Sequence, residues 1–482
     1  MNKLNWPRID DIPDLTDHQR EVAEISLSGR LGVLAGTPGC GKTFAAAAII
    51  KAIVAQHGAH NVGVCTPTGK AAVRLTADLQ KYKVDVEATT IHRLLQVRRL
   101  GYDGKGWGFH YGPQNKLPFR FIILDEGSMC GTDISNSLFS AIEPGTHVLI
   151  VGDPYQLTPV EHGAPLRDLK AAGVPWGELT EIKRNNGTAV QACKAMKEGR
   201  RWESASRINV ATGENLQHIE QQQPAHALAA MERIIGNCPQ QYDRTWDIQV
   251  LCAVNEKTEV SRGNLNARLQ AMLNPSGPTT KNGRFRLNDK VICTSNAQME
   301  LVPGADDPPG QSAGESVEAG KKYEQGDEIF GKSWGLPKRE TIKSRAFIAN
   351  GDIGRVVYVS EKEMHVRFLF PQRTVKVFVG AGNSKTGDET GNSNSGCDCD
   401  LAYAITTHKS QGSSAPIVIT MADGSFGAGQ ICSREWYYTA ISRLEIAGFT
   451  IGQRSVIDAH CRRVALGVRK TFLVEKLKEL VM

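Results

Sequence analysis

Residues 36–43, GTPGCGKT, combine glycines with a lysine and a threonine at the spacing of a phosphate-binding loop. An apolar run, 31–35, precedes them and an alanine-rich run, 44–50, follows, which predicts a strand, a loop and a helix in that order. The backbone N–H groups of such a loop bind phosphates at the positive end of the helix. The nucleotide-binding residues predicted here are Gly36, Thr37, Pro38, Gly39, Cys40, Gly41, Lys42 for the terminal phosphates and Thr43 for Mg²⁺.

Two adjacent acids, Asp125 and Glu126, follow the apolar run 121–124. Downstream of a phosphate loop they predict the second half of an NTPase site, with Asp125 holding Mg²⁺ and Glu126 orienting and deprotonating the attacking water. Glu126 could instead cap the following helix. GTP-specific proteins normally carry an N-K-x-D recognition loop. The nearest match in this chain, NEKT at 255–258, lacks the aspartate, so ATP is the expected nucleotide.

Arg184 and Arg443 are candidates for stabilising the charge that builds up on the γ-phosphate during phosphoryl transfer. Either one, taken alone, could be an ordinary surface cation. On opposite sides of a cleft, the two would make closure of the cleft depend on ATP.

Apolar strand-like runs alternate with helical segments in two separate parts of the chain. This order predicts an α/β fold with parallel sheets covered on both faces, arranged as two nucleotide-fold lobes. The expected strands are 31–35, 61–65, 121–124 and 148–151 in the first lobe, and 247–252 and 416–420 in the second; the expected helices include 16–29, 256–273 and 436–443.

Two insertions interrupt these lobes. Residues 346–380 contain short alternating strands that predict an antiparallel meander or barrel, flanked by polar segments at 302–340 and 381–396 that we expect to be loops. Residues 98–112 predict a hairpin arm, on which Trp107, Phe109 and Tyr111 share one face. Packing of these aromatic rings on their own domain explains the pattern as well as a functional wedge does.

Composition sets broad limits on the whole chain. Its 482 residues suffice for about three domains, and no apolar run approaches the ~20 residues that span a bilayer. The first residues lack a secretion signal, and the 11 scattered cysteines are typical of reduced thiols in a cytoplasmic protein. A net charge of +6 permits a polyanionic partner without requiring one.

Nine sequence blocks, in order, resemble the superfamily 1 DNA helicases of the 5′→3′ branch, of the RecD-like and Dda-like kind. The blocks are LTDHQREV (15–22), GTPGCGKT (36–43), CTPTGKAAVRL (65–75), TTIHRLL (89–95), LDEGSM (124–129), VGDPYQLTPV (151–160), LTEIKRN (179–185), AYAITTHKSQG (402–412) and YYTAISR (437–443). The resemblance covers nearly the whole chain. It departs from the family at Gly127, where alanine is common, and at 302–340, which has no clear counterpart.

The resemblance implies roles for individual residues. Gln19 is expected to bind adenine, although it also fits a helix-capping box with Thr16. Gln156 would sense the γ-phosphate, while Arg184 and Arg443 would act as paired arginine fingers. The implied nucleic-acid contacts are Thr66, Pro67, Thr68, Lys70, His92, Thr406, His408 and Lys409, together with Trp107 and Phe109 on the arm, which occupies the place of a strand-separating pin.

The resemblance also implies an architecture and an activity. Two RecA-like P-loop NTPase lobes would span 1–190, with the pin near 96–118, and 191–290 plus 398–482; a small β-barrel with flexible loops would occupy 291–397. The implied activity is ATP-dependent, 5′→3′ unwinding of DNA with Mg²⁺. The implied partners are single-stranded DNA and forked duplex DNA, with single-strand-binding, replication or recombination proteins as candidates. The chain is expected to act as a monomer and not on a membrane.

Three alternatives remain at this point. An RNA translocase would differ only in contacts to the 2′-OH, which sequence does not reveal. A non-catalytic clamp is disfavoured because Lys42, Asp125, Glu126, Arg184 and Arg443 are all present. A small-molecule kinase would leave the second lobe and the barrel without a purpose.

Overall fold

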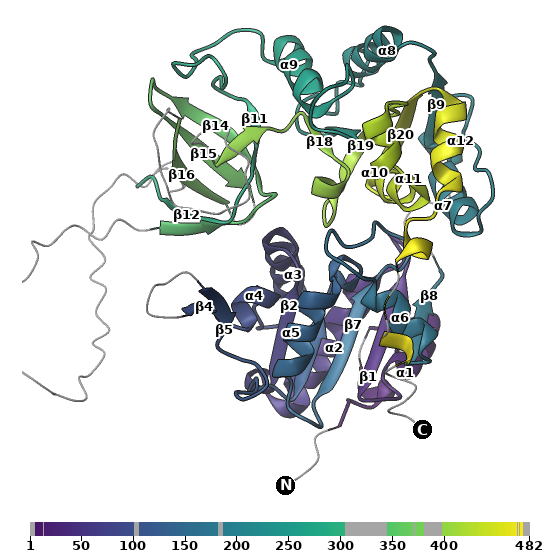
Figure 1. The fold of residues 1–482 in the computed structure, drawn as a ribbon, viewed down its shortest axis with the longest axis vertical. Helices are drawn as coiled ribbons and strands as arrows, with labels where there is room; N and C mark the ends of the chain where they lie inside the picture. The colour runs from purple at the N-terminus through teal and green to yellow at the C-terminus, as the bar shows by residue number, and fades with distance from the viewer. Residues whose placement is uncertain are drawn as a thin grey trace, which may run out of the picture.

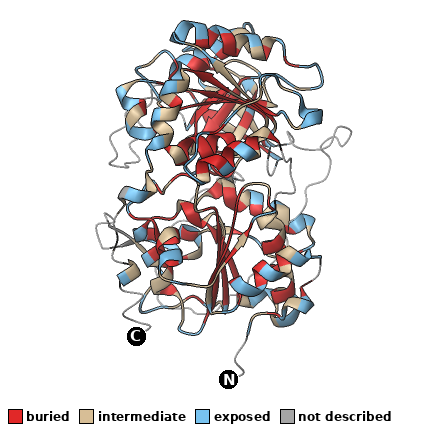
Figure 2. Cartoon of the chain, turned by 90° about the vertical axis from the view of Figure 1, so that its right-hand side faces the viewer, coloured by how far each residue is buried: buried red, intermediate tan, exposed pale blue. Residues whose placement is uncertain are grey.

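The structure of the chain is a computed structural model that describes residues 5–12, 14–100, 106–181, 187–303, 345–369, 372–379, 398–469, 471 and 473–475. Two α/β lobes lie one above the other, and a small β-sheet stands beside the second lobe (Figure 1). Buried residues concentrate on the central strands of the lobes (Figure 2). Within the described ranges, no helix has the length and apolar character that a bilayer crossing requires.

The first lobe is built on a six-stranded parallel sheet in the order β3-β2-β6-β7-β1-β8. All four strands expected here are confirmed to within two residues at either end, because each apolar run is buried on both faces of the sheet. The strands are β1 (Leu31–Gly36), β2 (Val62–Thr66), β3 (Thr89–Thr90), β6 (Phe121–Leu124), β7 (His147–Gly152) and β8 (Trp176–Leu179).

Helices α1 (Asp17–Ser26), α2 (Lys42–His57), α3 (Gly69–Lys81), α4 (Ile91–Leu94), α5 (Thr132–Ala141) and α6 (Pro165–Ala171) accompany this sheet, with 3₁₀ turns η1 (Ile9–Asp11), η2 (Ala59–Asn61) and η3 (Gly127–Met129). The apolar residues of α2 pack into the core of this lobe together with those of β2 and β6.

The second lobe is a five-stranded parallel sheet in the order β18-β10-β19-β20-β9. Its strands are β9 (Leu216–Glu220), β10 (Ile248–Cys252), β18 (Ala404–Thr406), β19 (Ala415–Met421) and β20 (Leu444–Gly452). Its helices are α7 (Thr188–Lys197), α8 (Pro224–Gly236), α9 (Arg262–Leu273), α10 (Phe426–Ile431), α11 (Arg434–Ile441) and α12 (Arg454–Arg462), with 3₁₀ turns η4 (Val210–Thr212), η5 (His408–Ser410) and η6 (Leu466–Val468).

One helix of this lobe is shorter than predicted. The sequence predicted a helix over 256–273, but α9 begins at Arg262. Lys257 has a φ of 75°, which lies in the left-handed region and cannot continue a right-handed helix. The prediction for residues 256–261 is therefore wrong.

The small sheet is antiparallel, in the order β16-β15-β14-β11-β17. Its strands are β11 (Lys290–Cys293), β14 (Ile353–Val359), β15 (Glu363–Leu369), β16 (Gln372–Phe378) and β17 (Cys399–Leu401), and a two-stranded sheet of β12 (Ala297–Glu300) and β13 (Arg345–Ile348) lies beside it. The predicted boundary after residue 397 assigned β17 to the second lobe, whereas the strand pairs with β11.

An antiparallel pair also extends from the first lobe, formed by β4 (Val97–Leu100) and β5 (Gly106–Phe109). Val97 pairs with Phe109, and Arg99 pairs with Trp107. Phe109 and Tyr111 are partly buried and pack against the core of the first lobe. For these two rings, the structure shows the packing that the sequence left open as an alternative.

Candidate nucleotide and nucleic-acid sites

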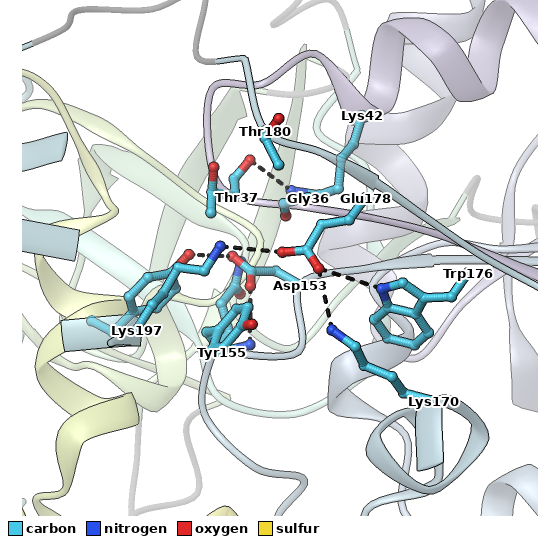
Figure 3. A network of polar contacts seen from close by, with 12 residues as sticks. Gly36, Thr37, Lys42, Asp153, Tyr155, Lys170, Trp176, Glu178, Thr180 and Lys197 are labelled. Atoms are coloured by element: carbon cyan, nitrogen blue, oxygen red, sulfur yellow. Dashed lines mark hydrogen bonds and ion pairs between the residues drawn. The ribbon is translucent and has the colours of Figure 1, made fainter. Parts of the chain in front are cut away.

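The loop between β1 and α2 adopts a backbone conformation that requires glycine at specific positions. Gly39 and Gly41 have φ of 82° and 87°, in the left-handed region that favours glycine. A Cβ on Gly36 would lie 2.5 Å from the sulfur of Cys40, so the close approach of strand and loop also requires glycine there. Lys42 donates hydrogen bonds from Nζ to the carbonyl oxygens of Gly36, at 2.6 Å, and Thr37, at 3.1 Å (Figure 3).

The two acids follow β6 as the sequence predicted. Asp125 Oδ1 accepts a hydrogen bond from the N–H of Glu126 at 2.8 Å. Burial, and then the nearby charge of Glu126, raise the pKa of Asp125 to about 7. Glu126 has a φ of 54°, a left-handed conformation that is costly for a residue with a side chain and that is often found at active sites.

Gln19 is both a capping residue and an available binding group. Its Oε1 accepts from the N–H of Thr16 at 3.2 Å, and its own N–H donates to the hydroxyl of Thr16, which completes the capping box. Its buried Nε2 has no hydrogen-bond partner, and a Cβ on Gly41 would lie 2.8 Å from it. The cap therefore directs an unused amide toward the phosphate loop.

Asp153, which the sequence reasoning did not single out, joins the two lobes. It is fully buried and accepts hydrogen bonds from the Tyr438 hydroxyl at 2.9 Å, the Tyr155 N–H at 3.0 Å and Gln156 Nε2 at 3.4 Å. Burial raises the pKa of its carboxyl. The signal was present, because Asp153 lies in the block that supplied Gln156, but its partner Tyr438 comes from the other lobe.

Gln156 keeps one buried oxygen free. Its Oε1 has no hydrogen-bond partner, and the residue is among those lining the cavity described below. The next residue, Leu157, donates its N–H to the Thr439 hydroxyl of α11 at 2.8 Å. A movement of the segment that carries Gln156 would therefore displace α11 of the second lobe through this hydrogen bond.

Arg443 projects from the end of α11 toward the first lobe. It is 7% exposed, and it donates to the carbonyl oxygens of Thr439 and Ser413, at 3.2 Å in both cases. Burial lowers the pKa of its guanidinium, and the charge of Glu126 opposes that effect. Arg184, the second predicted arginine finger, lies outside the described residues.

A third arginine, Arg74 of α3, was not singled out, although it lies in the block 65–75 that supplied Thr66 to Lys70. Its Nη1 donates to the carbonyl oxygen of Gly412 in the second lobe at 3.0 Å. Its charge also acts on the buried Asp125. Arg74 therefore connects the acidic pair to the facing lobe.

These groups surround one cavity of about 770 Å³ between the lobes. Its volume lies within the usual range for small-molecule sites. The first lobe lines it with the loop, the acidic pair, Arg74 and Gln156, and the second lobe with the Arg443 region and α7. Lys197 of α7, which also lines the cavity, forms an ion pair of 3.2 Å with Glu178 of β8, and Glu178 forms a second ion pair of 3.2 Å with Lys170 (Figure 3).

The nucleic-acid candidates of the first lobe lie at the start of α3. Thr66 is buried and donates to the carbonyl oxygen of Thr68, whose own hydroxyl caps the helix. Pro67 lies between them and is partly exposed. His92 is exposed, and its ring lies 5.8 Å from that of Phe109. The side chain of Trp107 lies outside the described residues.

Lys70, another of the predicted nucleic-acid contacts, has a buried ammonium. Its Nζ is enclosed without a hydrogen-bond partner, and burial lowers its pKa to about 8, against the opposing charge of Asp352 in the small sheet. A Cβ on Gly69 would lie 2.4 Å from that of Ala349, so the small sheet abuts this helix start. In this arrangement the ammonium of Lys70 is shielded from solvent, while the residue as a whole is partly exposed.

The second-lobe candidates lie between β18 and β19. Thr406 is buried, and its hydroxyl accepts from the N–H of Lys409 at 3.4 Å. Partial burial lowers the pKa of both His408 and Lys409. Thr406 ends β18, and His408 and Lys409 lie in η5, which leads to Gly412 at the cavity.

Comparison with known proteins connects this geometry to a family. Residues 14–233 match a model described as an AAA domain, and residues 401–443 match a UvrD-like helicase C-terminal domain. The ATP-dependent RecD2 DNA helicase of Deinococcus radiodurans is 29% identical over 96% of this chain and 52% of its own length. The RecBCD enzyme subunit RecD of Mycolicibacterium smegmatis is 25% identical over 96% of this chain and 75% of its own.

The chain thus spans about half the length of its RecD2 relative. A solved Bacteroides Pif1 helicase structure, in complex with ADP-AlF3 and ssDNA, aligns over 97% of both chains with a TM-score of 0.49 and 15% identity, too distant a likeness to support a conclusion. The AAA-domain match covers the first lobe and extends into α8 of the second, and the UvrD-like match lies almost entirely in the second lobe. The chain is therefore similar to superfamily 1 helicases of the RecD type.

Proposed function

We propose that the chain is an ATP-dependent DNA helicase that moves 5′→3′ along single-stranded DNA and separates duplex DNA. The observation that carries the proposal is the cavity between the lobes, where Lys42 of the first lobe and Arg443 of the second line the same space. A nucleotide there would touch both lobes, so binding and hydrolysis would change how they sit together. The name of the RecD2 relative, an ATP-dependent DNA helicase, supports the same activity.

The site fits a magnesium nucleotide. Gln19 Nε2 and Thr37 Oγ1 are buried polar atoms without partners, as expected of groups that bind a ligand. Asp125 and Thr43 are oxygen donors of the kind that Mg²⁺ prefers, and a cation would favour the charged form of the buried Asp125. The cation, when bound, would neutralise charge on the phosphate oxygens.

The remaining residues divide the chemistry among them. Lys42 would exchange the carbonyls of its own loop for phosphate oxygens, and Glu126 would orient and deprotonate the attacking water. Arg443, with Arg184 as its proposed counterpart, would stabilise charge on the γ-phosphate from outside the loop. Gln156 would contact the γ-phosphate, and a shift of its segment would be transmitted to the second lobe. The connection would run through the hydrogen bonds of Asp153 with Tyr438 and of Leu157 with Thr439.

For the nucleic-acid path, we place single-stranded backbone along the starts of α3 and η5. The contacts would be Thr66, Pro67, Thr68, Lys70 and His92 from the first lobe, and Thr406, His408 and Lys409 from the second. Hydroxyls and backbone N–H groups at helix starts suit phosphate contact without base reading. Since Lys70 is enclosed by the small sheet, its contact with DNA requires that sheet to shift away from α3.

In this proposal the small sheet is a small barrel and the β4–β5 pair is the strand-separating pin. We further propose a monomer in the cytoplasm that acts on single-stranded and forked DNA, with single-strand-binding, replication or recombination proteins as candidate partners. The ten cysteines that the structure describes are all free thiols, which suits a reducing compartment.

The pin assignment predicts different effects for two neighbouring aromatic residues. Trp107→Ala is expected to reduce duplex unwinding by about tenfold or more while ATP hydrolysis stimulated by single-stranded DNA stays within about twofold, because a wedge acts only at the fork. Phe109→Ala should instead lower the thermal unfolding midpoint, because its ring packs on the first lobe. Equal losses of unwinding and hydrolysis in Trp107→Ala would contradict the pin.

Stimulation of hydrolysis tests the substrate class. ATP hydrolysis should rise with added single-stranded DNA, and DNA and RNA oligonucleotides of matched sequence should then compete for that stimulation. The proposal predicts that DNA stimulates more strongly at equal concentration. Stimulation by RNA alone would replace the DNA helicase with an RNA translocase, and no stimulation by either would favour a nucleotide-binding clamp.

A further inference from the structure

Cys293 of β11 and Cys399 of β17 lie directly opposite each other in the small sheet, with their Cα atoms in register. Next to them, the N–H of Thr294 donates to the carbonyl oxygen of Asp398 at 2.8 Å. Hydrogen-bonded and non-hydrogen-bonded residue pairs alternate along an antiparallel ladder. Since 294 and 398 form a hydrogen-bonded pair, the two cysteines form a non-hydrogen-bonded one.

This position suits a disulfide. Opposed residues in a non-hydrogen-bonded pair have Cα atoms about 4.5 Å apart, which falls within the roughly 4.4–6.8 Å span of disulfides. Both side chains belong to the same buried cluster, and they are 0% and 1% exposed. Their sulfurs already interact, because a hydrogen bond links the two thiols.

Their chemical environment separates this pair from other buried cysteines. The hydrogen bond from Cys399 holds the pKa of Cys293 below its usual value. Burial has the opposite effect on Cys65 and Cys130 of the first lobe, raising the pKa of Cys130 to about 12 and that of Cys65 further. Because the thiolate is the reactive form, Cys293 is the better nucleophile.

We propose that Cys293 and Cys399 form a reversible disulfide when the protein meets a peroxide or a small-molecule disulfide. With hydrogen peroxide, one thiolate attacks an oxygen to give a sulfenic acid, and the O–O bond breaks to release hydroxide, which takes up the proton lost by the thiol and leaves as water. The second thiol then attacks that sulfur, so the S–S bond forms and a second water leaves. The two sulfurs lose two electrons, which the peroxide accepts.

Access to the pair comes from the edge of the sheet. β17 is a three-residue strand that pairs only with β11 in this sheet, at the end of the strand order. A short edge strand opens locally at low cost, which would admit a small oxidant without unfolding the lobe. This inference goes beyond the proposed helicase activity and does not depend on it.

The bond would close the chain between the two strands into a covalent loop that contains the rest of the small sheet. β17 leads directly into β18 of the second lobe, and Asp400 of β17 forms ion pairs with Arg262 and Arg284. The disulfide would therefore fix the junction between the small sheet and the second lobe. Closing so long a loop should stabilise the fold, chiefly by restricting the unfolded chain.

Peptide mapping tests the proposal on the full chain. The reduced protein is treated with a slight excess of hydrogen peroxide or with oxidised glutathione, quenched in acid, alkylated while denatured, and digested without reductant. A peptide that joins Cys293 to Cys399 is expected, with a thermal unfolding midpoint that rises by several degrees and returns after dithiothreitol. Alkylated Cys293 and Cys399, glutathione adducts on them, or a cross-link elsewhere would each overturn the proposal.

Matched variants separate the disulfide from general oxidation. Cys293→Ser and Cys399→Ser should each lose both the cross-linked peptide and the rise in the unfolding midpoint. Cys238→Ser removes a thiol from the same buried cluster and should retain both. A rise in the midpoint that persists in Cys293→Ser would show that another oxidation causes it.

Discussion

Replacing Lys42 with alanine is expected to lower ATP hydrolysis by about 10³-fold or more while leaving the affinity for single-stranded DNA within about threefold. The ammonium of Lys42 donates hydrogen bonds to two carbonyl oxygens of the loop, and it is the group positioned to contact the terminal phosphates. Charge that develops on those oxygens would lose its nearest stabilising partner. Steady-state hydrolysis and fluorescence-anisotropy binding of a labelled oligonucleotide measure the two quantities.

Lys51 supplies the matched control for this variant. It lies on the same helix, α2, but does not line the cavity. Lys51→Ala should therefore hydrolyse ATP at close to the rate of the unchanged protein. Retention of hydrolysis in Lys42→Ala would contradict the assignment of the phosphate site.

The second large effect is expected from Arg443→Ala. An arginine supplied from outside the phosphate loop contributes about 10³–10⁵ in rate, so hydrolysis should fall by about 10³-fold. Nucleotide affinity should change much less, because the arginine acts mainly on charge that develops during the reaction. Single-turnover hydrolysis and titration with a fluorescent ATP analogue separate the two.

Arg443 also holds the carbonyl oxygens of Ser413 and Thr439, so folding must be checked in this variant by its thermal unfolding midpoint. Arg443→Lys keeps the charge but loses the two-armed geometry and should recover only part of the rate. Arg434→Ala, at the other end of α11 and outside the cavity, should hydrolyse ATP normally. An Arg443→Ala protein that folds and hydrolyses at the normal rate would exclude the arginine-finger role.

The sequence predicted the parts of the site that are contiguous in the chain. The loop from Gly36 to Thr43 and the pair Asp125–Glu126 are local motifs that follow buried apolar strands, so their spacing alone places them. The same reasoning predicted β1, β2, β6 and β7 of the first sheet and β10 and β19 of the second, because strands buried on both faces appear as continuous apolar runs. It did not predict β3, β8, β9, β18 or β20.

Contacts between distant segments could not be read in this way. Asp153 meets Tyr438, and Arg74 meets Gly412, only because the two lobes face each other. The enclosure of Lys70 depends on an insertion far along the chain, which brings Ala349 and Asp352 against α3. The local sequence does not reveal which distant segments pack together. A lysine that looks exposed in the sequence, such as Lys70, can therefore have its charged end buried in the fold.

The most direct test of the central claim is ATP-driven unwinding of a DNA duplex that carries either a 5′ or a 3′ single-stranded tail. The proposed motor should open the 5′-tailed duplex, require ATP and Mg²⁺, and leave the 3′-tailed duplex closed. Lys42→Ala should open neither. Unwinding of the 3′-tailed duplex alone would contradict the proposed polarity, and failure to open either substrate would contradict the helicase itself.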